Sequence, residues 1–64
     1  MGYKIKEARQ EKNMSQEELA LKSGVSRATI SALENGTERY VMTGTLVKLA
    51  KALDTTIDKI FFVS

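Results

Sequence analysis

Residues 15–36 read SQEELALKSGVSRATISALENG, and this stretch decides the fold. Ser15 is followed three residues later by a glutamate, a spacing typical of the capping box that begins a helix. Gly24 then predicts the end of that helix, because glycine adopts the left-handed backbone conformation without a Cβ clash. Ser26 is typical of a second N-cap, and Gly36 of a second helix end. The stretch therefore predicts two short helices joined by a tight turn.

The apolar residues of this stretch have the spacing that a corner between two helices requires. Ala20 has almost no side chain at the point where the next helix must come close. Val25 is expected to fill the inside of the corner. Ile30 and Leu33 lie three apart on the second helix and are expected to pack against Leu19 of the first. The two helices are thus predicted to cross at a steep angle.

Three further helices are predicted around this corner from apolar residues at helical intervals. The first covers roughly residues 2–11, and another begins after Thr43, which is expected to be its N-cap. A short last helix carries the apolar positions of Ile57–Phe61. Residues 37–42 are expected to form a loop. The sequence therefore predicts an all-α fold of five short helices, with residues 1–64 forming one domain.

Composition excludes several functional classes. The 64 residues contain no cysteine and no histidine, which removes thiolate metal sites and the commonest general base. We therefore expect no enzymatic activity, no metal or other cofactor and no small-molecule ligand. The net charge of +2 permits nucleic-acid binding but favours it only weakly. The sequence has no signal peptide and no apolar run of roughly 20 residues, so we expect a cytoplasmic protein without membrane contact.

Most of the chain resembles the helix-turn-helix domain of the phage repressor and Cro family. The resemblance implies a five-helix, phage-repressor-like domain with its helix-turn-helix at about residues 16–35. It also implies that the third helix enters the major groove of double-stranded DNA. The matching runs are Met14–Ala20, Ser23–Ser26, Thr29–Ser31, Leu33–Gly36, Thr45–Leu53 and Ile57–Phe61.

The outer face of the third helix is expected to read the bases. With Ile30 and Leu33 pointing inward, the residues that point outward are small, and none is acidic. Arg27 is the only long donor at the start of this helix. A bidentate contact from Arg27 to guanine would contribute about 1–3 kcal/mol of discrimination. Since alanine offers a base only a methyl group, much of the specificity is expected to come from DNA shape. The complete base-reading set is Arg27, Ala28, Ser31 and Ala32.

A second set of residues is expected to contact DNA phosphates. The resemblance places Gln16 at a phosphate-binding position, beside the first amides of its helix. The alternative for Gln16 is an ordinary solvent-facing residue. The resemblance also pairs Arg9 with Glu34 in a buried ion pair, with a phosphate contact as the alternative for Arg9. The other phosphate candidates are Thr29, Asn35, Arg39, Tyr40 and Thr43.

The last apolar residues predict an interface. Phe62 and Val63 follow the residues that complete the core, and adjacent exposed apolar groups often mark a contact with another protein. We therefore expect a homodimer; the alternative is that Phe62 folds back over the first helix. The expected function is a transcriptional regulator, a repressor that binds a palindromic operator. The alternative is a protein-interaction module of the same fold, such as an antitoxin-like subunit, that does not read DNA.

Overall fold

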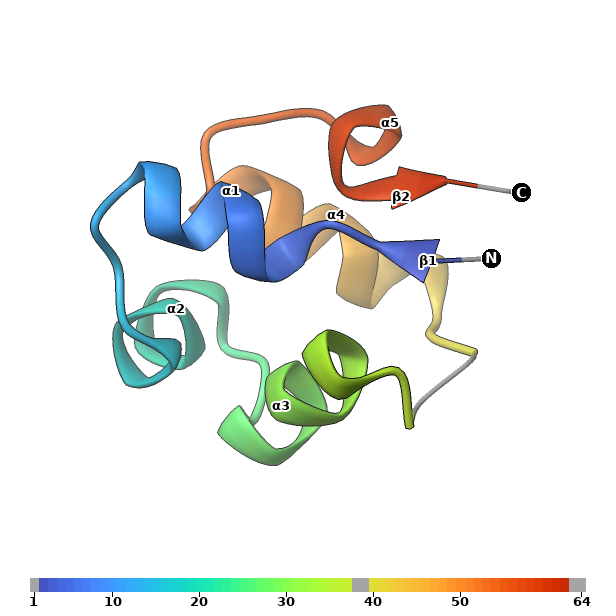
Figure 1. The fold of residues 1–64 in the computed structure, drawn as a ribbon, viewed down its shortest axis with the longest axis horizontal. Helices are drawn as coiled ribbons and strands as arrows, with labels where there is room; N and C mark the ends of the chain where they lie inside the picture. The colour runs from blue at the N-terminus through green and yellow to red at the C-terminus, as the bar shows by residue number, and fades with distance from the viewer. Residues whose placement is uncertain (1, 38–39, 63–64) are drawn as a thin grey trace.

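The computed structural model describes residues 2–37 and 40–62, the last of these by its backbone alone. Figure 1 shows α2 and α3 together at the bottom of the molecule, α1 and α4 across its middle and α5 at the top. The predicted all-α fold with five helices is confirmed. The elements in chain order are β1 Gly2–Tyr3, α1 Ile5–Glu11, α2 Gln16–Ser23, α3 Arg27–Asn35, α4 Thr43–Ala52, α5 Ile57–Ile60 and β2 Phe61–Phe62.

One hydrophobic core joins all five helices. Helices of four to ten residues are too short to be stable alone in water, so their packing against one another holds them. Within the part of the chain that the structure describes, no helix is long and apolar enough to cross a membrane. The largest fully buried side chains are those of Ile5, Leu19, Ile30, Leu49, Leu53 and Ile60.

The predicted caps of α2 and α3 are present. The Ser15 hydroxyl accepts a hydrogen bond from the backbone N–H of Glu18 at 3.0 Å, and the Glu18 carboxylate accepts one from Ser15 N–H at 3.4 Å. The Ser26 hydroxyl caps α3 by accepting from the amide three residues later. Both helices end at a left-handed glycine, Gly24 with φ +75° and Gly36 with φ +76°.

The prediction that the first helix starts at residue 2 was wrong, because α1 begins at Ile5. β1 instead pairs with β2 in a short antiparallel ladder, which puts Tyr3 opposite Phe61. Their ring centroids are 5.4 Å apart, and Lys4 N–H donates to the carbonyl of Ile60 at 2.8 Å. Phe61, expected in the last helix, therefore belongs to a strand. The cause is a contact between the two ends of the chain, which helical periodicity does not register.

The expected cap of α4 was also wrong. The N-cap is Met42, whose backbone is extended with φ −66° and ψ 143° and whose side chain makes no capping hydrogen bond. Thr43 is already the first helical residue. A hydroxyl caps a helix from the residue before the first helical one, so the Thr43 side chain is displaced by one position from that role.

Candidate nucleic-acid interface

α3 has one buried side and one open side. Ile30 is fully buried and Leu33 is 2% exposed, so this stripe anchors the helix in the core. Arg27 and Ala28 are exposed in its first turn. The predicted base-reading residues therefore share the side of α3 that faces away from the core. Ser31 and Ala32, the later two of these residues, are half-buried, and the exposed Asn35 lies on the same side.

The turn between α2 and α3 is held by short-range contacts. The N–H of Gly24 donates to the carbonyl of Ala20 at 2.9 Å, and the N–H of Val25 donates to the hydroxyl of Ser23 at 3.1 Å. The Val25 side chain is 8% exposed and belongs to the core. These contacts fix how α3 leaves α2, and hence the direction in which its open side faces.

A second set of contacts ties α3 to α1. Arg9 Nε lies 2.9 Å from Glu34 Oε2, and Arg9 Nη2 donates to Glu34 Oε1 at 3.1 Å. The third guanidinium nitrogen, Nη1, donates to the carbonyl of Met14 at 2.8 Å. The Arg9 side chain is 13% exposed and that of Glu34 only 3%. The structure thus contains the ion pair that the resemblance implies, in the bidentate geometry that is most specific for Arg and carboxylate.

Gln16 completes this network in a way that the sequence did not reveal. Its Nε2 atom donates to Glu34 Oε1 at 3.1 Å, which joins the first residue of α2 to α3. Burial of Glu34 alone would raise the pKa of its carboxyl group. The hydrogen bonds from Arg9 and Gln16, with the charges of Arg9 and Lys6, outweigh burial and lower this pKa. The hydrogen bond to Glu34 raises the pKa of Arg9. The pair is therefore ionised and compensated at neutral pH.

The hydroxyl groups of the α3 N-cap and of α3 itself take part in a short series of hydrogen bonds. Ser26 Oγ accepts from the N–H of Thr29 and lies 2.9 Å from Thr29 Oγ1, to which it donates. The Thr29 oxygen accepts this hydrogen bond, so the hydroxyl proton of Thr29 can be donated to another acceptor. Asn35 Nδ2 likewise donates to Ser31 Oγ at 3.3 Å. Thr29 and Ser31 each accept one of these hydrogen bonds, and each hydroxyl has one proton with which it can donate to an anionic partner.

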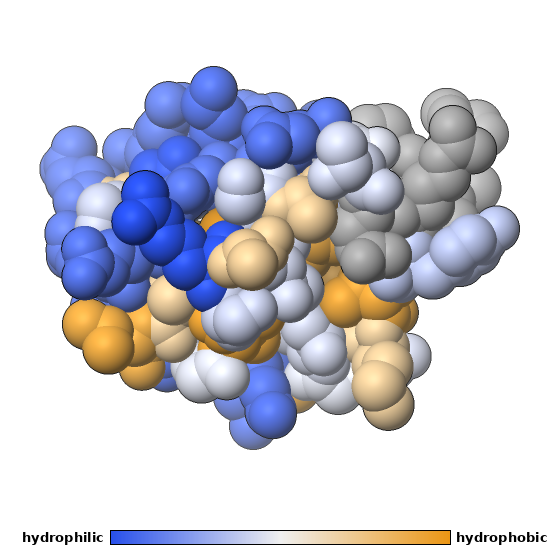
Figure 2. Space-filling view, turned by 90° about the horizontal axis from the view of Figure 1, so that it is seen from below, coloured by the Kyte–Doolittle hydropathy of each residue, from blue (hydrophilic) through white to orange (hydrophobic). Residues whose placement is uncertain are grey.

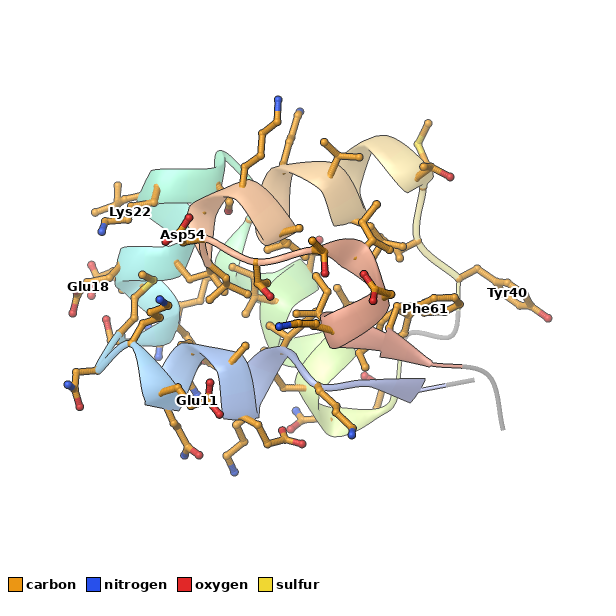
Figure 3. All side chains as sticks on the ribbon, turned by 90° about the horizontal axis from the view of Figure 1, so that it is seen from above. Glu11, Glu18, Lys22, Tyr40, Asp54 and Phe61 are labelled. Carbon is orange, nitrogen blue, oxygen red and sulfur yellow. The ribbon has the colours of Figure 1, made fainter. Side chains whose placement is uncertain are left out.

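The segment that leads into α4 holds two more of the expected phosphate contacts. Tyr40 is 78% exposed, and Figure 3 shows it projecting at the opposite end of the molecule from Glu18 and Lys22 of α2. Thr43 is exposed at the start of α4. The expectations for Arg39, for the side chain of Phe62 and for Val63 lie outside the described residues.

The surface around α2 and α3 also contains an exposed apolar residue to which the sequence analysis assigned no role. Leu21 is 81% exposed on α2. Helical geometry indicates this exposure, because a residue two positions after the buried Leu19 is turned by about 200° around the helix axis. Figure 2 looks onto the α2 and α3 side: hydrophilic residues cover its upper and left parts, and apolar residues appear at separate places, at the lower left, in the middle and towards the right.

Comparison with known proteins agrees with this geometry. The helix-turn-helix family model matches residues 5–60. The chain belongs to the helix-turn-helix family. It is also similar to control protein C.SmaI of Serratia marcescens, with 43% identity over 60 residues, which cover 94% of this chain and 70% of that protein. The expected family is confirmed, and the protein is a DNA-binding transcription regulator. Residues 5–60 of this helix-turn-helix protein include all of α1 to α5, so the family match rests on the whole helical core.

Proposed function

We propose that this regulator is a repressor that binds a palindromic operator as a homodimer, with α3 of each protomer in the major groove. The observation that carries the proposal is the open side of α3. An exposed Arg27 at its start is followed by small side chains, on a helix that the core and the Glu34 network hold rigidly. A helix enters the groove only where its outer side chains leave room for close approach.

In this proposal Arg27 makes the main base contact, to O6 and N7 of a guanine. Ser31 contributes one hydroxyl, and Ala28 and Ala32 contribute methyl groups that pack against thymine methyls. With so few donors on α3, direct contacts specify few base pairs. The flexibility and groove width of the remaining base pairs contribute the rest of the specificity.

The phosphate contacts lie at both ends of the helix-turn-helix. Gln16 at the start of α2 and Thr29 in the first turn of α3 donate to one backbone segment. Asn35, Tyr40 and Thr43 contact another, together with the Arg39 expected from the sequence. These contacts set the register of the protein on the duplex but carry no sequence information themselves.

A homodimer fits the dimensions of one protomer. Half-sites read by a symmetric dimer lie about 34–36 Å apart on one face of the DNA. The Cα atoms of one protomer extend over 27 × 21 × 20 Å, so two protomers fit on successive major grooves without overlapping. They would then meet at their ends. The apolar Phe62 and Val63 at the C-terminal end favour that end as the contact.

The alternative is a protein-interaction module, and one observation favours it. Leu21 and Met42 are 81% and 79% exposed, and large exposed apolar side chains are a common feature of binding surfaces. Under this alternative Leu21 of α2 or Met42 before α4 would contact another protein, and α3 would read no bases.

Selection from a random DNA pool at about 0.15 M salt tests the proposal, because salt of this strength weakens binding by phosphate contacts alone. The proposal predicts a palindromic motif with a guanine in each half-site. A single half-site without symmetry would contradict the homodimer but leave DNA reading intact. A pool without enrichment would contradict the DNA-reading proposal and favour the protein-interaction module.

A further inference from the structure

We propose that Glu34 is a positioning residue for DNA binding, and that it acts by orienting the side-chain amide of Gln16 towards a phosphate. This inference rests on the proposed function, in which Gln16 contacts the DNA backbone. It adds a residue to the interface that touches no DNA itself, since only 3% of the Glu34 side chain is exposed.

The inference follows from the number of hydrogen-bond donors on the Gln16 side chain. A glutamine amide has two N–H donors, and the hydrogen bond to Glu34 Oε1 uses one of them. That bond fixes the plane of the amide, so the second N–H has a defined direction before any DNA is present. The Gln16 side chain is half-buried, which leaves part of it open to a ligand. The backbone N–H groups of Gln16 and Glu17 take part in none of the described hydrogen bonds. They lie in the first turn of α2, at the same end of the helix as the Gln16 side chain.

Fixing the amide in advance has an energetic consequence. A free glutamine side chain loses rotamer freedom when it binds, and this loss is an entropic cost that weakens binding. Because Glu34 already holds Gln16, that cost belongs to folding rather than to DNA binding. The phosphate then gains a donor that is already oriented.

The charge of Glu34 would oppose a nearby phosphate if it were not compensated. Arg9 removes this obstacle, because its guanidinium pairs with both carboxylate oxygens of Glu34. The arrangement therefore combines a strong acceptor for Gln16 with a locally neutral environment. Arg9 is in turn fixed by the carbonyl of Met14, just before α2. The four groups act as one unit beneath the start of α2.

A double-mutant cycle on the selected operator tests the inference. Gln16→Ala is expected to weaken operator binding about three- to tenfold, the range of one hydrogen bond. In a Glu34→Met protein, which has no acceptor for Gln16, the same change should weaken binding less than twofold. In Glu34→Gln, whose amide oxygen still accepts from Gln16, the full effect should return. Gln10→Ala, an exposed glutamine of α1, is the matched control and should leave the affinity unchanged.

The salt dependence of binding separates this role from an ionic one. Because Gln16 is neutral, its loss should lower the affinity at every salt concentration without changing the slope of affinity against salt. Equal losses from Gln16→Ala in all three Glu34 backgrounds would overturn the inference, and so would no loss in the wild type. Failure of the wild type to bind the operator would instead contradict the proposed function before any variant is compared.

A direct observation keeps the test decisive if Glu34→Met does not fold. In the wild-type protein, the two Nε2 protons of Gln16 should give separate NMR signals, with one shifted by its bond to Glu34. On addition of operator DNA, the second signal should move while the first stays in place. Loss of the first signal's shift on DNA binding would mean that Gln16 leaves Glu34, and would overturn the inference.

Discussion

The α2–α3 corner and the β1–β2 ladder lie at two sides of the same small protein but are stabilised differently. In the corner, hydrogen bonds join residues two to four apart, and Leu19 and Ile30 beneath them are fully buried. The ladder has two residues in each strand, and its stabilising contact is the half-exposed ring pair of Tyr3 and Phe61. The corner is therefore the rigid part of the molecule. The ladder is a smaller contact that joins residues near the two ends of the chain.

The largest difference is expected between two leucines of α2. Leu19→Ala removes a fully buried side chain from the corner and should lower the free energy of unfolding by about 3–5 kcal/mol. Leu21→Ala, two residues away and 81% exposed, should change it by less than about 0.5 kcal/mol. Urea denaturation followed by circular dichroism measures both. Similar losses from the two variants would mean that the corner is not the rigid part.

A smaller effect is expected from the ion pair that fastens the corner to α1. Glu34→Ala leaves the largely buried Arg9 guanidinium without its carboxylate and should cost about 2–4 kcal/mol. Glu11→Ala, at an exposed position of α1, is the control and should cost less than about 0.5 kcal/mol. A loss near that of the control would show that α1 and α3 are held by apolar packing alone.

The same pair predicts a pH dependence. The pKa of Glu34 in the folded protein lies below its unfolded value, so the pair contributes its full stability above the usual glutamate pKa of about 4.3. That contribution is lost as the pH falls through the folded-state pKa. Between about pH 5 and pH 3, the wild type should therefore lose more stability than Glu34→Gln does. Parallel stability curves for the two proteins would contradict this assignment.

Whether the sequence predicts a structural feature depends on how far apart in the chain the contacting residues are. The capping box of Ser15, the cap by Ser26 and the glycine ends of α2 and α3 are local features, and each was predicted correctly. The N-cap of α4 was missed by one residue, because an extended Met42 resembles no capping signal. The ladder was missed because it joins Tyr3 to Phe61 at opposite ends of the chain, where no local pattern describes the pairing.

The candidate site divides in the same way. Helical geometry was enough to place Arg27 and its small neighbours on the open side of α3. The pairing of Arg9 with Glu34 is long-range and came from the family resemblance rather than from spacing. The hydrogen bond from Gln16 to Glu34 depends on the crossing of α2 and α3 in three dimensions, so only the structure reveals it.

The smallest effects are expected from two glycines that both have room for a Cβ but differ in backbone conformation. An added Cβ would meet no atom within 4 Å at either Gly24 or Gly44. Gly24 has φ +75°, so Gly24→Ala should cost about 1–2 kcal/mol through backbone strain. Gly44 lies within α4, so Gly44→Ala should increase stability by about 0.5–1 kcal/mol. Thermal unfolding of the two variants, compared with the wild type, measures both; a shift in the same direction for both would contradict the role of Gly24 as the stop of α2.

One variant measured on two DNAs shows whether the open side of α3 reads DNA sequence. Affinities of wild type and Arg27→Ala are measured at about 0.15 M salt, on the selected operator and on random DNA of equal length. Arg27→Ala is expected to weaken operator binding by roughly tenfold or more, because a bidentate guanine contact is lost, and to weaken random DNA binding far less. Equal losses on both DNAs would contradict it, because Arg27 would then contact phosphate alone.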